Sequence, residues 1–145
     1  MSEEKKEAVA VEEVVVKHER DPERIAVLNM YTTFNNTIAT LTDLSGMVIA
    51  RVSGGMMTKQ DRLKANPTTA MFIAKRISEM AKDKKINALY VKIRSETGST
   101  SAGPGAHAAV KSLIRDGFRI VNISEVTRMP RGGPKAGGGR RGRRV

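Results

Sequence analysis

The sequence predicts an α/β domain built on one mixed five-stranded sheet with two helices, in the order βββαβαβ. Three observations predict it. Five apolar runs rich in β-branched residues are bounded by turn-forming residues. Two segments with apolar residues at helical spacing separate the last three of these runs, whereas only short turns separate the first three. The chain has 145 residues, a length typical of one domain with a modest core.

The first three strands are predicted to form an antiparallel meander. They are residues 25–32, 37–42 and 47–52. Residues 34–36 form the first turn, and Asp43 and Gly46 take the first and fourth places of the second, as a type I turn favours. Gly54 and Gly55 then end the meander.

Two helices and two further strands follow. Asn66 caps the first helix and Pro67 suits its first position. Its apolar stripe is Ala70, Ile73, Ala74, Ile77, Met80 and Ala81. Pro104 opens the second helix and Gly117 ends it. The last strands are expected at residues 86–93 and 119–126. A strand, a helix and a strand over this length imply a right-handed parallel crossover.

Charge divides the chain into three parts. It has 26 Lys and Arg residues against 15 Asp and Glu, a net charge of +11. Residues 1–24 form an acidic extension with eight acids and five bases. Residues 25–127 form the α/β body, which carries +7, and the tail of residues 128–145 adds another +7. The excess of cations in the body and tail indicates a polyanionic partner.

The tail is rich in Arg and Gly and contains no acid. Its cations are Arg128, Arg131, Lys135, Arg140, Arg141, Arg143 and Arg144. Such a segment cannot bury enough apolar surface to offset its ordering entropy, so we expect it to be disordered alone, and the acidic extension likewise. Arginine forks match the geometry of phosphate, which favours nucleic acid as the partner. The alternative is a solvated tail that only aids solubility.

Composition excludes several classes of site. There is no Cys, so disulfides and thiolate metal sites are excluded. No apolar run approaches the ~18 residues of a membrane span. The acidic N-terminus lacks the basic region and the apolar stretch of a secretory signal. We therefore expect a cytoplasmic protein that is not bound to a membrane and that holds no metal or cofactor. With no Trp, two Tyr and three Phe, a sheet of stacking aromatics is not expected.

The loop before the second helix has half of a phosphate-binding motif. Gly98 and Gly103 are separated by four residues, but Pro104 and Gly105 stand where the Lys and the Ser or Thr are required. Nucleotide hydrolysis is therefore not expected. Free N–H groups at the helix start can still hold a phosphate, and the alternative is a plain flexible loop.

Two further sets of polar residues stand out in the sequence. The cations at the end of the first helix suit the helix dipole or contact RNA, with equal support; they are Lys82, Lys84 and Lys85. The acids of the body show no metal-ligand or acid–base spacing. They are Asp43, Asp61, Glu79, Asp83, Glu96, Asp116 and Glu125.

Several motifs together resemble the small-subunit ribosomal protein S11 family, in its archaeal or eukaryotic form, over roughly residues 25–145. They are Thr42-Asp43-Leu44-Ser45-Gly46, Gly54-Gly55-Met56 with Lys59 and Asp61-Arg62, Ala70-Met71, Gly103-Pro104-Gly105-Ala106, Val126-Thr127 and the ending Gly138-Gly139-Arg140-Arg141-Gly142-Arg143-Arg144-Val145. The family usually has Pro-Gly-Pro-Gly before the second helix, and Ala102 replaces the first Pro here. That loop also lacks the basic residues of many relatives, which favours backbone contacts there.

The resemblance implies a ribonuclease-H-like fold without its catalysis. It also implies a place on the platform of the small subunit near the messenger exit channel, where the protein binds small-subunit rRNA and neighbouring ribosomal proteins and lies close to mRNA. The RNA contacts carried over are Lys59, Arg62, Lys64, Ser99, Thr100, Gly103, Gly105, His107 and the tail cations. The alternatives are a metal-dependent nuclease, which needs clustered carboxylates, and a free RNA chaperone.

Overall fold

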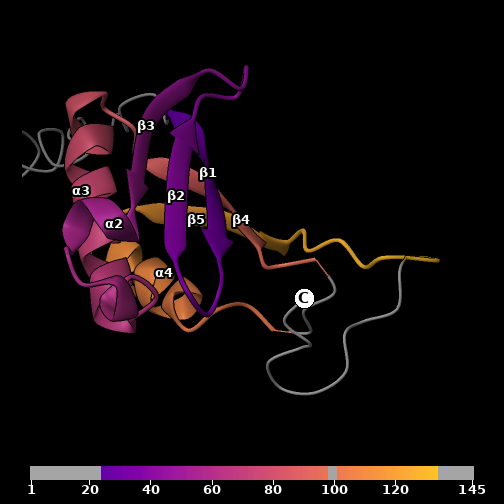
Figure 1. Ribbon diagram of the computed structural model, residues 1–145. Helices are drawn as coiled ribbons and strands as arrows, with labels where there is room; N and C mark the ends of the chain where they lie inside the picture. Colours follow the sequence, from indigo (N-terminus) through magenta and orange to yellow (C-terminus); the bar gives the residue numbers. More distant parts are fainter. Residues whose placement is uncertain (1–23, 98–100, 134–145) are drawn as a thin grey trace, which may run out of the picture.

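The fold is a five-stranded mixed sheet with its helices gathered on one side (Figure 1). The computed structural model describes residues 24–97 and 101–133. The strands are β1 (Ile25–Thr32), β2 (Thr37–Thr42), β3 (Val48–Ser53), β4 (Ala88–Arg94) and β5 (Arg119–Glu125). The helical elements of this part are α2 (Gly54–Met57), the 3-10 turn η1 (Asp61–Leu63), α3 (Pro67–Asp83) and α4 (Gly105–Arg115). The predicted α/β class and the five strands are confirmed.

The strand order is β3-β2-β1-β4-β5. The first three strands pair antiparallel, and Thr32 faces Thr37 at the β1–β2 hairpin. β4 runs parallel to β1 and to β5, so the predicted meander and parallel pairings are confirmed. Because β1, β4 and β5 run the same way, their last residues lie at one end of the sheet, which we call the carboxyl end.

Helix α3 begins as predicted and ends in a turn that the sequence did not reveal. The side chain of Asn66 accepts a hydrogen bond from the N–H of Thr68 at 3.0 Å, and Pro67 is the first helical residue. At the other end, the N–H of Ile86 donates to the carbonyl of Ala81 at 3.0 Å, and Lys85 has a φ of 56°. This left-handed cap is usually made by Gly. It uses residues 86 and 87, so β4 starts later than predicted.

The prediction of only two helices was wrong, because α2 and η1 lie in a segment with weak local signals. The reason is a tertiary contact at Gly54. A Cβ atom there would lie 2.5 Å from the backbone oxygen of Lys64 and 2.7 Å from Oδ1 of Asn36. The absence of a side chain therefore lets the segment from α2 to η1 fold back against the β1–β2 hairpin.

The core lies between the sheet and the two long helices. Alternate residues of β1 face the helices and are almost fully buried, among them Leu28 and Met30. The predicted stripe of α3 is buried except for Met80, which is half-buried at its rim. Burying a side chain such as Leu28 contributes about 1.5–3 kcal/mol. Helix α4 packs beside α3, with Leu113 in the same core.

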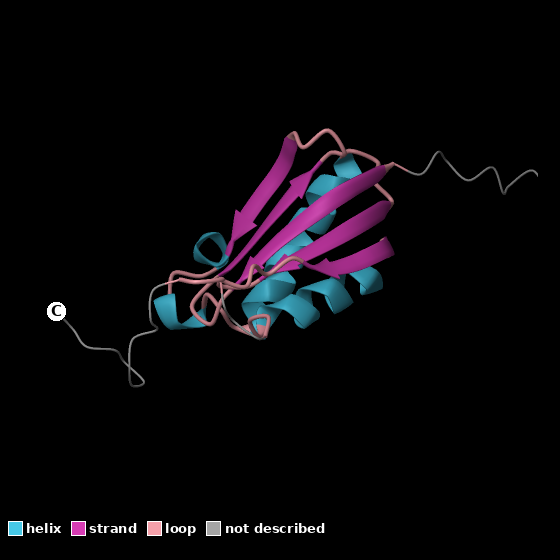
Figure 2. Cartoon of the chain, turned by 90° about the vertical axis from the view of Figure 1, so that its right-hand side faces the viewer, coloured by secondary structure: helices cyan, strands magenta, loops and turns pink. Residues whose placement is uncertain are grey.

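The opposite face of the sheet is not covered by any helix of the described chain (Figure 2). On β4, Leu89, Val91 and Ile93 point to the helices, so Tyr90, Lys92 and Arg94 point to the bare face. Parallel strands are usually covered on both faces. A bare face over the parallel strands β1, β4 and β5 therefore marks a surface that suits a partner.

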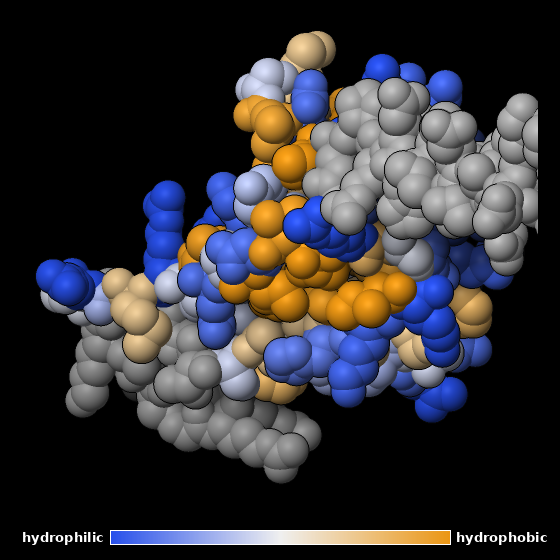
Figure 3. All heavy atoms as spheres, turned by 180° about the vertical axis from the view of Figure 1, so that it is seen from behind, coloured by the Kyte–Doolittle hydropathy of each residue, from blue (hydrophilic) through white to orange (hydrophobic). Residues whose placement is uncertain are grey.

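Strand β5 forms one outer edge of the sheet and is the least buried strand in the described residues. It exposes Val121 at 40% and Ile123 at 50% of their surface. Seen from the back, apolar atoms gather in the middle of this side of the molecule (Figure 3). An exposed apolar edge strand favours contact with another chain.

The contact at Gly54 gives a prediction with a matched control. The Gly54→Ala substitution places a methyl group against backbone and should destabilise the fold by about 1–3 kcal/mol. For a domain of this size, such a loss lowers Tm by roughly 5 °C or more. Gly55→Ala meets only the side chain of Lys64, at 3.6 Å, and should leave Tm unchanged or raise it. Thermal denaturation followed by circular dichroism measures both. Equal Tm values for the two variants would contradict the assigned contact.

Candidate nucleic-acid interface

The loops after β1, β4 and β5 meet at the carboxyl end of the sheet (Figure 2). The loop before α4 touches the end of β1, since a Cβ atom on Gly103 would lie 2.7 Å from the carbonyl oxygen of Thr33. The segment after β5 touches the end of β4, where Oγ1 of Thr127 accepts a hydrogen bond from the N–H of Ser95 at 3.0 Å. Residues far apart in the sequence are thus brought to one end of the domain.

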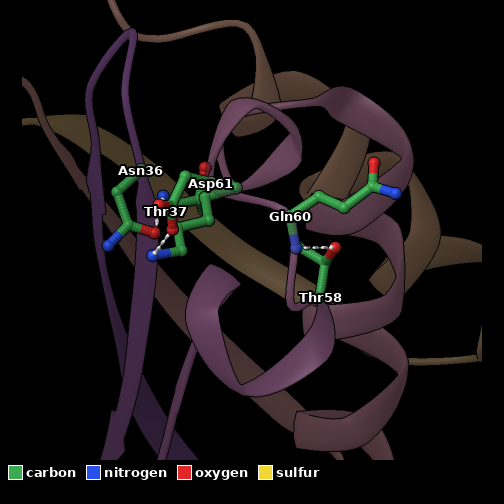
Figure 4. Close-up of polar contacts among 6 residues, drawn as sticks. Asn36, Thr37, Thr58, Gln60 and Asp61 are labelled. Carbon is green, nitrogen blue, oxygen red and sulfur yellow. Dashed lines mark hydrogen bonds and ion pairs between the residues drawn. The ribbon is translucent and has the colours of Figure 1, made fainter.

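The predicted cations of residues 59–64 lie beside the β1–β2 hairpin. Lys59 and Arg62 are exposed and Lys64 is half-buried. A shallow pocket separates this segment from the hairpin; it is lined by Phe34, Asn35, Asn36, Asp61, Arg62 and Lys64. Figure 4 shows Asn36 and Thr37 of the hairpin close to Asp61. The contact at Gly54 holds this segment next to the hairpin, because it joins the backbone of Lys64 to Asn36.

Lys64 already has an anionic partner. Its Nζ lies 2.5 Å from Oδ1 of Asp61, whose side chain is 89% exposed. The hydrogen bond from Lys64, and then its positive charge, hold the pKa of Asp61 below the ordinary value of 3.8. A phosphate that binds Lys64 competes with this carboxylate, whereas Arg62 forms none of the ion pairs found in the described residues.

The residues predicted around the start of α4 divide into three groups. Gly103 and Gly105 are buried. A Cβ atom on Gly105 would lie 2.8 Å from Cβ of Ala70 and 2.8 Å from Oγ1 of Thr37, so both glycines have a role in joining elements of the fold. His107 is exposed in the first turn of α4. Ser99 and Thr100 lie outside the described residues.

The start of the tail is anchored to the sheet. The N–H of Val126 donates to the carbonyl of Ile93 at 2.8 Å, which continues the path of β5 beside β4. Arg128 and Arg131 follow and are exposed. The remaining predicted tail cations lie outside the described residues; they are Lys135, Arg140, Arg141, Arg143 and Arg144.

The sequence reasoning missed two cations on the bare face. Lys92 and Arg94 of β4 are exposed there, and Arg94 lies beside Tyr31 of β1, with its guanidinium carbon 5.7 Å from the ring centre. With Thr40, Val126 and Arg128 they line a depression that we call the sheet groove. Polar residues at every second position of β4 were the available signal. That β1, with Tyr31, lies next to β4 is known only from the parallel pairing of the two strands.

The cations at the end of α3 are not part of this arrangement. Lys82, Lys84 and Lys85 lie by the start of β4, at the far end of the sheet from the loops described above. Nζ of Lys82 lies 5.9 Å from the ring centre of Phe118, and the carbonyl of Lys84 accepts from Arg24 at 3.4 Å. These contacts favour their interpretation as residues of a helix terminus.

The described ranges, 24–97 and 101–133, contain neither a cluster of metal-binding side chains nor a membrane-spanning helix. No group of three or more His, Cys, Asp or Glu side chains is arranged to hold a metal ion there. None of the helices in these ranges combines the length and the apolar character required to cross a bilayer.

A mixed α/β domain that exposes cations at one end of its sheet, and whose sequence continues from that end into an arginine-rich tail, has the features of a nucleic-acid-binding protein. Comparison with known families identifies it further. The sequence model of the family described as Ribosomal protein S11 matches residues 26–141, which include all but the first residue of the body and most of the basic tail. The chain belongs to this family.

Membership defines the general role of the protein. It is a structural component of the small ribosomal subunit that binds rRNA and neighbouring ribosomal proteins and serves translation. Ribosomal proteins of this family are normally not enzymes, and the small subunit is in general cytoplasmic. The nuclease and RNA-chaperone alternatives gain no support from the comparison.

The Asp61–Lys64 pair gives a prediction for titration. We expect the carboxyl carbon of Asp61, followed by NMR, to titrate below pH 3.8, and Lys64→Met to raise this pKa towards the ordinary value. Because the folded pKa is lowered, the pair stabilises the fold above the unfolded pKa, and this contribution is lost as the pH falls through the folded pKa. The effect on Tm should be small, since the Asp61 side chain is 89% exposed and water screens the pair.

Lys59→Met is the matched control for this titration, because it also removes one cation from the same segment but leaves the partner of Asp61 in place. An identical shift in both variants would mean that general charge, rather than the contact with Lys64, sets the pKa.

Proposed function

We propose that the protein docks on folded rRNA of the small-subunit platform, near the messenger exit channel, through the carboxyl end of its sheet. The observation that carries the proposal is the placement of two separate basic segments at this end of the sheet: exposed Lys59 and Arg62 lie beside the β1–β2 hairpin, and exposed Arg128 and Arg131 follow β5. The platform position rests on the family resemblance of the sequence, as does the proximity to mRNA.

In this proposal the body and the tail act differently. The body presents a rigid surface whose shape fits folded RNA, since the Gly54 and Gly103 contacts hold its loops in place. Exposed Lys59, Arg62 and His107 face phosphates, and Lys64 does so in competition with Asp61. Ser99 and Thr100 add contacts from the loop before α4, together with the backbone at Gly103 and Gly105.

The tail orders on binding and neutralises phosphates where RNA segments converge. Its proposed contacts are Arg128, Arg131, Lys135, Arg140, Arg141, Arg143 and Arg144. Since the N–H of Val126 is bonded to β4, the tail starts from a fixed point on the sheet. This anchoring limits the RNA segments that the tail can reach.

Two finer assignments are also proposed. The sheet order, with a three-stranded meander continued by two parallel strands, supports a ribonuclease-H-like fold. The motifs quoted above support the archaeal or eukaryotic type of the family. In this assignment the body is residues 25–127, the tail is residues 128–145, and the acidic extension, residues 1–24, lies before the family match.

Salt dependence tests the role of the tail. Each phosphate neutralised on a single strand contributes roughly −0.7 to the slope of log affinity against log salt, and on a duplex about −0.9. Removing residues 140–145 deletes four arginines and should make the slope for an rRNA fragment shallower by about 3. A variant with Lys at these four positions keeps the charge and should keep the slope. An unchanged slope after the deletion would refute the role.

Sedimentation tests the assignment to the particle. The protein should remain with the small-subunit peak of a cell extract at moderate salt. A free RNA chaperone would instead be found mainly in the light fractions.

A further inference from the structure

We propose that the sheet groove binds an unpaired RNA nucleotide, with its base against the ring of Tyr31 and its phosphates on Lys92, Arg94 and Arg128. This inference rests on the proposed function, because it assigns a second RNA-binding surface to the same protein. It differs from docking at the carboxyl end in what it recognises, namely a single exposed base.

The size and chemistry of the groove suit a nucleotide. Its volume is about 430 Å³, within the range of sites that hold a small ligand. Apolar and hydroxyl-bearing residues form its floor, among them Ile38 and Thr40, and three of its lining residues are cations. No Asp or Glu lines it. The groove therefore favours a ligand that combines an apolar part with negative charge.

Tyr31 and Arg94 contact each other at the groove. The two residues are direct neighbours in the parallel pairing of β1 and β4, and the guanidinium lies 5.7 Å from the ring centre. Tyr31 remains 38% exposed. A ring and a guanidinium held in place by neighbouring strands form a platform on which a base can stack without further ordering of either side chain.

Both tyrosines of the chain lie on the bare face of the sheet. The sequence has only two, and both Tyr31 and Tyr90 belong to the bare face, since the residues flanking them on β1 and β4 are buried under the helices. The small number of aromatic residues in the sequence argues against a sheet on which many bases stack. The fold nevertheless places both tyrosines on the one face that no described helix covers. Tyr31 reaches the groove and Tyr90 does not line it.

The groove is continuous with the start of the tail. This continuity favours RNA over an acidic peptide as the ligand. Val126 and Arg128 line the groove at the point where the chain leaves the sheet towards its arginine-rich end. A strand of RNA with one base in the groove can therefore continue from Arg128 towards Arg131, the next cation of the chain. An acidic peptide would satisfy the charges but would leave the stacking surface of Tyr31 unused.

The experiment compares two ligands of equal charge on the full-length protein. Fluorescence anisotropy measures binding of an unstructured RNA of eight uridines and of an eight-unit abasic RNA. We expect the uridine RNA to bind more tightly. Tyr31→Ala should weaken its binding about tenfold, as loss of one stacked base predicts, and should remove the preference over the abasic RNA. Tyr31→Phe keeps the ring and should preserve that preference.

Charge variants complete the test. Lys92→Gln and Arg94→Gln should weaken binding of both RNAs, more than Lys75→Gln, which removes one exposed cation from α3 on the helix side of the sheet. Circular dichroism of each variant confirms that it is folded. Equal binding of the uridine and abasic RNAs to the wild type would overturn the proposal, as would competition by oligoglutamate as effective as competition by uridine RNA.

The outcomes separate this inference from the proposed function. If Tyr31→Ala binds both short RNAs like the wild type but the protein still sediments with the small subunit, the groove assignment fails alone. If the protein leaves the small-subunit peak at moderate salt while the stacking preference is present, the ribosomal placement fails and the groove remains.

Discussion

The contact between Gly105 of α4 and Ala70 of α3 holds the two long helices close together, and much of the carboxyl end depends on it. A Cβ atom on Gly105 would come within 2.8 Å of both the Ala70 methyl group and the hydroxyl of Thr37. The start of α4 is therefore fixed against a helix and a strand at once. Gly103, two residues earlier, is held against the end of β1 in the same way.

Gly54 has the same function for the other basic segment. It brings the backbone of Lys64 to Asn36 of the hairpin, and so holds the segment of Lys59 and Arg62 beside this hairpin. Close contacts at glycines thus position the charged side chains of the neighbouring residues. A surface that recognises RNA by shape needs this rigidity, because ordering a loose loop on binding would cost about 1–2 kcal/mol per residue.

Local chemistry explains what could be predicted from the sequence. The bounds of β1 and β2 match the prediction because the turn after each has strong turn-forming residues, and α3 starts at Pro67 because Asn66 caps it. Helix α2 could not be predicted, since its stabilising contact joins Gly54 to a residue ten positions later and to the hairpin. The late start of β4 follows from an αL residue, Lys85, where a Gly would have been the recognisable signal.

The candidate site divides in the same way. Cations could be found one by one from the sequence and the family resemblance, but their meeting at one end of the sheet required the strand order. Tyr31 and Arg94 are far apart in the chain and become neighbours only because β1 pairs with β4. The predicted tail contacts remain predictions, because most of the tail lies outside the described residues.

The outer position of β5 has a consequence for the supply of the protein in the cell. A copy that has not yet met its assembly partners exposes Val121 and Ile123 on a strand whose outer side pairs with no other strand of the described residues. Copies synthesised in excess of new rRNA are therefore prone to self-association. Solubility should thus depend on balanced synthesis of protein and RNA, or on a chaperone that shields this strand until incorporation.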